Sequence, residues 1–164
     1  MAIPAFLAEL RTLVGHRPLW LPGVAAVVLD ESGRVLLGRR ADDGRWALVG
    51  GILDPGEQPA DGVVRECLEE TGVLVEPESL TMVSVSPVID YPNGDRCQYL
   101  DLTFRCRYVS GDARVNDDES LAVAWYAQDA LPELDDYTRR RIGLALEGKG
   151  ETVFDFAGHA PGRS

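Results

Sequence analysis

The sequence has few cysteines and no long apolar run. Its 3 cysteines are an odd number, and their spacing matches neither a disulfide framework nor a zinc motif. We therefore expect reduced thiols, which are typical of cytoplasmic proteins. No run approaches the roughly 18 apolar residues of a membrane-spanning helix, and the first residues lack the layout of a signal peptide. These absences predict a soluble cytoplasmic protein that does not bind membranes.

Basic residues are also scarce. The chain contains 16 lysines and arginines against 27 acidic residues, which gives a formal net charge of −11. Nucleic-acid surfaces normally carry a basic patch, so we expect no nucleic-acid partner. An anionic ligand would have to be attracted by local arginines or by bound cations, because the overall charge repels it.

The chain shows no internal repeat, low-complexity tract or interdomain linker. Its 164 residues suit one main domain, which we place at residues 19–150, with a helical extension at residues 1–18 and a tail at residues 151–164. An amphipathic helix is predicted over residues 4–14. Its apolar stripe either covers the domain of its own chain or forms a homodimer contact.

Short strands surround one central helix in the predicted arrangement. The helix begins at Pro59 and ends before Gly72, positions that suit a helix start and a helix stop. A second helix of about 17 residues is predicted at residues 131–148. Strands are predicted at residues 23–30 and 34–40 as a hairpin, and at residues 46–49, 79–91, 97–109 and 121–127. This mixture predicts an α/β fold.

Three glutamates crowd the last turn of the central helix. Glu66, Glu69 and Glu70 lie within an arc of about 100° on a helical wheel. The opposite side of the wheel carries Val63, Val64, Cys67 and Leu68. Like charges at this spacing destabilise a helix by roughly 0.2–0.5 kcal/mol per pair, and the helix dipole disfavours anions at this end. A solvated surface is the ordinary interpretation of an acidic cluster, but such violations of local rules tend to mark functional sites.

A divalent cation would reverse this unfavourable arrangement. Mg²⁺ prefers oxygen ligands, which carboxylates provide, and the preceding segment adds Glu57 and a Gly50–Gly51 turn. The cluster offers no histidine or cysteine set for zinc, and no EF-hand spacing for calcium. We expect Mg²⁺, with Mn²⁺ as a substitute.

These residues carry a family resemblance. Gly51, Glu57 and the run from Arg65 to Val73 resemble the signature box of Nudix hydrolases. Weaker similarity extends the resemblance over roughly residues 22–147. Val49 departs from a frequent proline and Cys67 from an aliphatic or small residue, and neither touches a charged position. The resemblance implies an α/β/α sandwich with a central mixed sheet, and hydrolysis of a nucleoside diphosphate linked to another group.

The resemblance also implies roles for individual residues. Glu66 and Glu70 would be the principal Mg²⁺ ligands, helped by Glu69 and the carbonyl of Gly50. Arg65 would orient a glutamate, and Glu57 would support the loop or a second metal ion. The general base would be a glutamate of the box or an acid in the loop at residues 116–120, where Glu119 is the candidate ahead of Asp118 and Glu119 would also bind metal. A solvated turn is the alternative for that loop.

Substrate binding is assigned to a few basic and aromatic residues. Arginine suits phosphate recognition and tyrosine suits stacking on a base. The candidates are Arg39, Arg40, Tyr99 and Arg105. A solvated strand end is the alternative for the first two.

We expect a small nucleotide substrate. An ADP-ribose-like nucleotide sugar is favoured by Pro87, and a nucleoside triphosphate or dinucleoside polyphosphate is the alternative that Tyr91 favours. Two other classes stay open: a ligand-sensing module without catalysis and an isomerase that acts on an allylic diphosphate. The unmodified signature box disfavours both.

Overall fold

The computed structural model describes residues 4–156. They form three helices and nine strands, and the expected tail beyond residue 156 lies outside the described residues. The helices are α1 (Ala5–Val14), α2 (Pro59–Thr71) and α3 (Asp136–Glu147). The strands are β1 (Leu19–Leu29), β2 (Val35–Arg40), β3 (Trp46–Ala47), β4 (Val49–Ile52), β5 (Leu74–Val85), β6 (Ile89–Asp90), β7 (Arg96–Ser110), β8 (Ser120–Tyr126) and β9 (Val153–Phe154).

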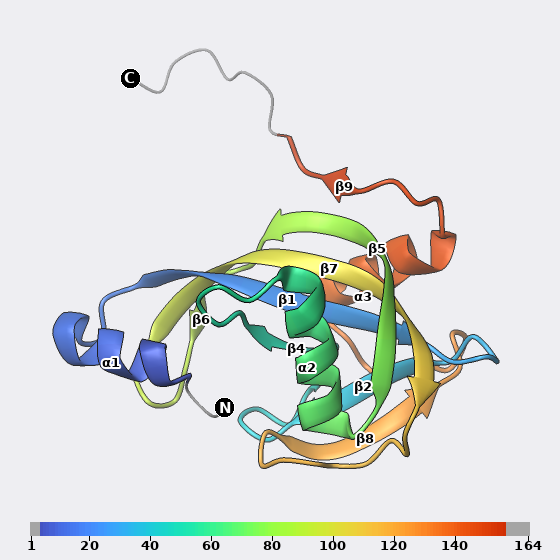
Figure 1. The fold of residues 1–164 in the computed structure, drawn as a ribbon, viewed down its shortest axis with the longest axis horizontal. Helices are drawn as coiled ribbons and strands as arrows, with labels where there is room; N and C mark the ends of the chain where they lie inside the picture. The colour runs from blue at the N-terminus through green and yellow to red at the C-terminus, as the bar shows by residue number, and fades with distance from the viewer. Residues whose placement is uncertain (1–3, 157–164) are drawn as a thin grey trace.

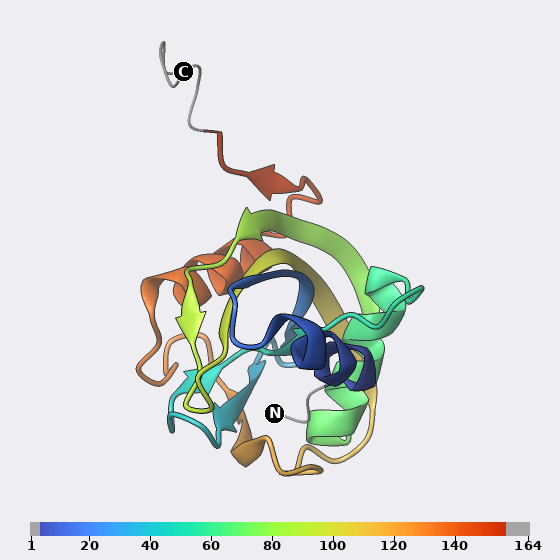
Figure 2. The same ribbon diagram turned by 90° about the vertical axis from the view of Figure 1, so that its left-hand side faces the viewer.

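The strands form one mixed sheet with the order β3-β2-β1-β7-β5-β9 (Figure 1). β1 runs parallel to β7 from the Leu19–Cys97 pair to the Leu29–Arg107 pair, and β5 is antiparallel to β7. β4 pairs antiparallel with β1, and β8 with β2. Figure 2 shows α2 and α3 on opposite sides of the sheet. The predicted α/β/α sandwich with a mixed sheet is therefore confirmed.

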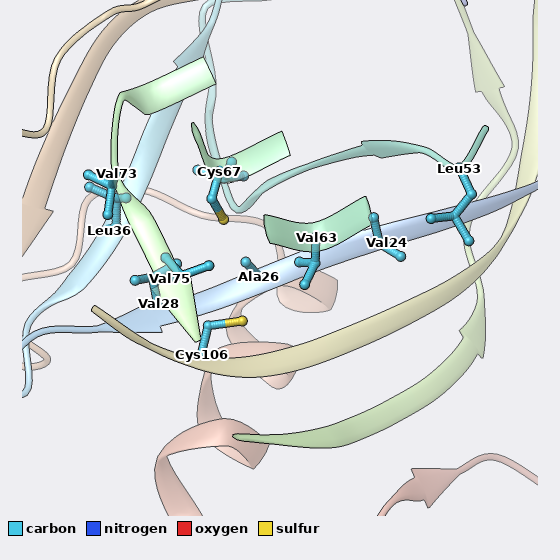
Figure 3. Packing of buried hydrophobic residues seen from close by; sticks show 11 residues of the cluster. Val24, Ala26, Val28, Leu36, Leu53, Val63, Cys67, Val73, Val75 and Cys106 are labelled. Carbon is cyan, nitrogen blue, oxygen red and sulfur yellow. The ribbon is translucent and has the colours of Figure 1, made fainter. Parts of the chain in front are cut away.

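Each helix covers its own part of the apolar core. The core beneath α2 includes Val63 and Cys67 of the helix and Val24, Ala26 and Val28 of β1 (Figure 3). A second cluster packs α3 against the other face of the sheet, and a third lies beneath α1. Burial on both faces explains why β1 reads as a nearly continuous apolar run.

The central helix has the predicted ends. Pro59 is at its first turn, and Gly72 follows it in the left-handed conformation with φ 70°. Two side chains differ from the helical wheel, because Leu68 is 46% exposed whereas Glu70 is only 8% exposed. The last turn faces β4, and there Gly50 N–H donates to the carboxyl of Glu70 at 3.3 Å.

Several of the strand boundaries predicted from the sequence were wrong. β1 begins at Leu19 rather than residue 23, because its first residues pair with β7 rather than with β2. The predicted hairpin is reduced to one pair, Leu29–Val35, since β2 pairs mainly with β8. The single strand expected at residues 79–91 divides into β5, which begins at Leu74, and β6. Long-range pairing decides these boundaries.

The ends of the C-terminal segment also differ from the prediction. α3 begins at Asp136 rather than residue 131, because Asp135 caps it by accepting from the backbone N–H of Thr138 at 2.7 Å. β9 lies inside the segment expected to be a tail and pairs parallel with β5.

Helix α1 packs on its own chain, at the end of the sheet where β1 and β7 begin (Figure 1). Leu7 is buried there against Leu21 and Ile52, and Arg11 Nε lies 3.1 Å from a carboxylate oxygen of Asp95. The apolar stripe thus covers the domain of the same chain, which was one of the two predicted roles. A homodimer stays a prediction. In residues 4–156, no helix has both the length and the apolar character needed to cross a membrane.

Leu36→Ala is expected to lower the free energy of unfolding by roughly 2–5 kcal/mol, because this fully buried side chain would leave a cavity beneath α2. Leu121→Ala on the neighbouring strand β8 is the matched control. That leucine is 58% exposed, so its loss is expected to cost less than about 0.5 kcal/mol. Urea titration measures both values, and equal losses would contradict the packing described.

Candidate active site

Arg65 of α2 binds three carboxylates at once. Its Nε and Nη2 donate to the two oxygens of Glu57 at 2.7 and 2.9 Å. Its Nη1 donates to Glu66 at 2.8 Å and to Glu69 at 3.1 Å. The hydrogen bonds from Arg65 hold the pKa of Glu57 below its usual value, although burial opposes them. One guanidinium thus forms charge-assisted hydrogen bonds with Glu57 and with two of the three helix glutamates, Glu66 and Glu69.

Two carboxyls remain poorly compensated. Burial raises the pKa of Glu66 to about 7, against the opposing effect of Arg65. Burial also raises the pKa of Glu70 to about 9, and the charges of Glu66 and Glu119 add to this effect. The Gly50 N–H opposes it weakly. Around pH 7 the Glu70 carboxyl is therefore largely neutral, whereas Glu66 is close to half protonated.

The two glycines of β4 make room for these carboxyls. A Cβ at Gly51 would collide with the carboxyl group of Glu66. A Cβ at Gly50 would collide with the carbonyl of Val24 on the paired strand β1. Neither position accepts a side chain without displacing a site residue or separating β4 from β1. The Gly50–Gly51 pair therefore keeps backbone and carboxyl oxygens close together.

Glu119 reaches this region through the loop that precedes β8. Asn116 in that loop donates through Nδ2 to the carbonyls of Leu68 and Glu69, at 3.2 and 3.0 Å. Its backbone N–H donates to the carbonyl of Glu70 at 3.1 Å. The Leu68 carbonyl also accepts from the Gly72 N–H, whereas the carbonyls of Glu69 and Glu70 lie in the last turn of α2, where helix partners are lacking. The bonds from Asn116 therefore hold the loop against the helix. The role of Asn116 was not predicted from the sequence, where its position next to the acidic run at residues 117–119 is the only signal.

A small cavity of about 50 Å³ brings the predicted residues together. Its lining includes Gly50, Glu70, Glu119 and Arg40. Asp118, the second candidate base, is exposed and does not line it, whereas the charge of Asp117 raises the pKa of Glu70.

The possible metal ligands near this cavity suit a hard divalent cation. They are carboxyl oxygens, and an ion there would offset the burial that raises the pKa values of Glu66 and Glu70. Among the residues described, no three acidic, histidine or cysteine side chains already surround one point. Glu66 would therefore exchange part of its contact with Arg65 for the ion.

The predicted substrate residues separate into two groups. Arg40 and Tyr99 line a cavity of about 130 Å³ together with Gly50 and Gly51. Arg40 binds Asp42 through Nε at 2.9 Å, and the Tyr99 hydroxyl lies 2.8 Å from that of Tyr91. This group adjoins the acidic cluster.

The other two arginines are engaged elsewhere. Arg39 donates to the carbonyl of Gly44 at 2.9 Å. Arg105 donates to Glu78 at 2.9 Å and to the carbonyl of Ala145 at 2.7 Å, near the end of α3. Neither lines the small cavity that Arg40 shares with Glu70 or the cavity that it shares with the two glycines.

A larger cavity of about 550 Å³ adjoins this region. It shares Arg40, Ala47, Tyr91 and Arg141 with the cavity that contains the two glycines. Sequence reasoning missed Arg141, because it belongs to a run of three arginines in α3 and only the folded chain shows which one is buried.

Comparison with known proteins identifies the family. Residues 19–145 match the model of the NUDIX domain, which covers most of the chain and all of the acidic cluster. The chain belongs to the NUDIX family. The predicted resemblance is confirmed.

Individual Nudix proteins agree with this assignment. The chain is 42% identical over 137 residues to a MutT-like protein of Streptomyces ambofaciens, and the matched region covers 83% of each chain. It is 32% identical over 114 residues to a putative 8-oxo-dGTP diphosphatase of Bacillus subtilis, which covers 70% of this chain and 71% of the relative. A crystal structure of an ADP-ribose pyrophosphatase from Streptococcus suis matches with a TM-score of 0.65 and 26% identity, over 82% of this chain and 98% of that one. The chain is a Nudix pyrophosphohydrolase of nucleotide derivatives.

The stability of the metal-free Nudix domain is expected to fall as the pH rises from about 6 to about 8.5. Glu66 and Glu70 have folded-state pKa values of about 7 and about 9, above the ordinary value of 4.5, so the folded chain binds more protons than the unfolded chain between these limits. Their stabilising contribution is complete below about pH 4.5 and is lost as the pH passes through the two folded-state values. We expect a loss of more than about 1 kcal/mol, because one pKa unit corresponds to about 1.4 kcal/mol.

Urea titrations across this range measure the slope. Glu70→Gln is expected to flatten it, whereas Glu69→Gln is expected to keep it, because the Glu69 side chain is 58% exposed. A wild-type protein with constant stability over this range would contradict the burial of neutral carboxyls.

Proposed function

We propose that the chain hydrolyses a pyrophosphate bond of a nucleoside diphosphate derivative in a Mg²⁺-dependent reaction. ADP-ribose or a similar nucleotide sugar is the proposed substrate. The observation that supports this most strongly is the pair of carboxyls beside the Gly50–Gly51 turn, with Glu70 buried and the Glu66 side chain only 12% exposed. Burying acids without a matching cation is unfavourable, and Mg²⁺ supplies the missing charge.

The proposed Mg²⁺ ligands are Glu66, Glu70 and the carbonyl of Gly50, with Glu69 as a further ligand. Mn²⁺ is the proposed substitute, since it also accepts oxygen ligands. When bound, the ion lowers the pKa of a coordinated water and neutralises charge on the phosphates. Arg65 holds the carboxylates in place, and Glu57 fixes Arg65 through its paired hydrogen bonds.

Glu119 is the proposed general base. It lines the small cavity with Glu70 and Gly50, and the loop that carries it is held to α2 by Asn116. This position allows a carboxylate to accept a proton from water beside the scissile phosphate. Glu119 is also a proposed metal ligand, and a glutamate of the signature box is the alternative base.

Arg40 and Tyr99 are the proposed substrate residues, because they line the cavity next to the two glycines. Arg40 is positioned to bind phosphate oxygens, and guanidinium groups suit that role. Arg39 and Arg105 have less support, because each binds backbone or acidic groups away from this cavity.

The proposed preference for a nucleotide sugar has support from two directions. The similar structure from Streptococcus suis is named an ADP-ribose pyrophosphatase. The cavity of about 550 Å³ next to Arg40 offers space for a group beyond the pyrophosphate. An oxidised or ordinary nucleoside triphosphate is the second candidate, since the Bacillus subtilis relative is named an 8-oxo-dGTP diphosphatase.

The remaining assignments are more general. The family match over residues 19–145 supports a Nudix domain near the predicted limits 19–150, preceded by an extension at residues 1–18 and followed by a tail. A cytoplasmic location stays a prediction, supported by three free cysteines in the described chain.

Glu70→Gln is expected to lower the rate with Mg²⁺ by about a thousandfold or more, because the variant cannot place a carboxylate on the metal. Initial rates on a panel of ADP-ribose, other nucleotide sugars, nucleoside triphosphates and dinucleoside polyphosphates measure this. Glu76→Gln is the matched control. Glu76 is exposed and pairs with Arg107 away from the acidic cluster, so this substitution is expected to leave the rates unchanged.

The same panel tests the competing functions. Absence of turnover by the wild type on every phosphoanhydride would leave the ligand-sensing module or the isomerase. Equal rates for wild type and Glu70→Gln would remove the assigned role of Glu70.

A further inference from the structure

An ionic network lies between β7 and α3, at the wall of the cavity that contains Gly50 and Gly51. Arg141 Nη1 and the hydroxyl of Tyr137 both donate to Asp101 Oδ2, each at 3.0 Å. The guanidinium carbon of Arg141 lies 4.3 Å from the centroid of the Tyr137 ring. The Tyr137 hydroxyl also contacts Ser84 Oγ at 2.7 Å. This network holds Arg141 in one orientation.

Arg141 has unused hydrogen-bonding capacity. The residue is only 9% exposed, and its Nε has no hydrogen-bond partner among the residues that the structure describes. Its remaining side-chain contact is a long one, from Nη2 to Thr138 Oγ1 at 3.5 Å. Nε is itself closed off from solvent, so the donors left for a ligand are the remaining N–H groups of Nη1 and Nη2, since a guanidinium has five N–H donors in all.

A purely structural role explains this arrangement poorly. Burying a salt bridge removes two charges from water, and a well-packed apolar pair of similar volume is often as stable or more stable. The network also borders open space rather than closed core, since Arg141 lines both the cavity with the glycines and the cavity of about 550 Å³. A buried polar group at a cavity wall is typical of a recognition site.

The position of Arg141 indicates which part of a substrate it meets. Arg40 lines the small cavity with Glu70 and also both larger cavities. Arg141 lines only the two larger ones and so lies farther from the acidic cluster. The wall around it includes Trp46, Tyr91 and Tyr137, whose rings suit contact with a planar group.

We propose that Arg141 is a specificity-determining residue that donates hydrogen bonds to the nucleobase of the substrate. Asp101 and Tyr137 are positioning residues that hold its guanidinium at the wall of the two cavities. A fixed arginine fork selects ligands that present acceptor atoms on a base edge. This inference rests on the proposed function for the orientation of the substrate, with the pyrophosphate at the acidic cluster.

The test is calorimetric binding to the full chain with Mg²⁺, using AMP, GMP, CMP, UMP and inorganic pyrophosphate as probes. Arg141→Lys keeps the charge but loses the planar fork. We expect it to lower the affinity for the most tightly bound nucleoside monophosphate by about tenfold or more, and to change the affinity for pyrophosphate by less than about twofold. Arg140→Lys is the matched control, because Arg140 adjoins Arg141 in sequence but binds Asp155, and it is expected to change neither affinity.

Tyr137→Phe provides a second, milder variant in case Arg141→Lys does not fold. It removes only the hydroxyl that donates to Asp101, so we expect the same selective loss with a smaller magnitude. On a substrate that the wild type hydrolyses, it is expected to raise KM and leave kcat nearly unchanged, which a general loss of structure would not do.

The outcomes separate this inference from the proposed function. Equal losses for nucleotide and pyrophosphate, unchanged nucleotide affinity, or a wild type that binds no nucleoside monophosphate would overturn the role of Arg141. Selective loss of nucleotide affinity in a protein without turnover would support Arg141 and contradict hydrolysis. Turnover by the wild type together with unchanged nucleotide affinity in both variants would support hydrolysis and contradict the role of Arg141.

Discussion

The contact between Arg65 and three glutamates is the interaction on which the site depends. It lets Glu57, Glu66 and Glu69 share one helix region without a bound cation. Its reach ends before Glu70, which is instead buried against Gly50. The domain therefore folds around an acidic cluster that is balanced on one side and unbalanced on the other. The unbalanced side is where a cation gains most by binding.

The rest of the fold shapes the region around Glu70 and the neighbouring Glu66. β4 reaches the carboxyls through two glycines, and its pairing with β1 leaves no space for a larger residue at position 50. Asn116 closes the end of α2 and places the loop of Glu119 beside it. On the other side, Arg40 of β2 and Arg141 of α3 line the two larger cavities from different elements. The proposed metal and substrate regions thus adjoin one another at packed elements of the fold.

The sequence predicts the parts of this arrangement that depend on local patterns. The ends of α2, the acidic cluster and the mixed sheet follow from spacing, helix ends and apolar runs. It did not predict the start of β1 or the exposure of Leu68, because strand pairing and the last turn of α2 decide those. Asp101 and Arg141 look like surface residues of an alternating strand and an amphipathic helix, and only the packing of α3 on β7 buries them.

Proton release on Mg²⁺ binding tests the central claim most directly. Calorimetry at about pH 7.5 in buffers of different ionisation enthalpy counts the protons, since carboxyls must deprotonate to bind a metal ion. The raised pKa values of Glu66 and Glu70, about 7 and about 9, predict release of about one proton by wild type and clearly less by Glu70→Gln. Binding of Mg²⁺ without proton release, or equal release from both proteins, would contradict the claim that carboxyls with raised pKa values form the metal site.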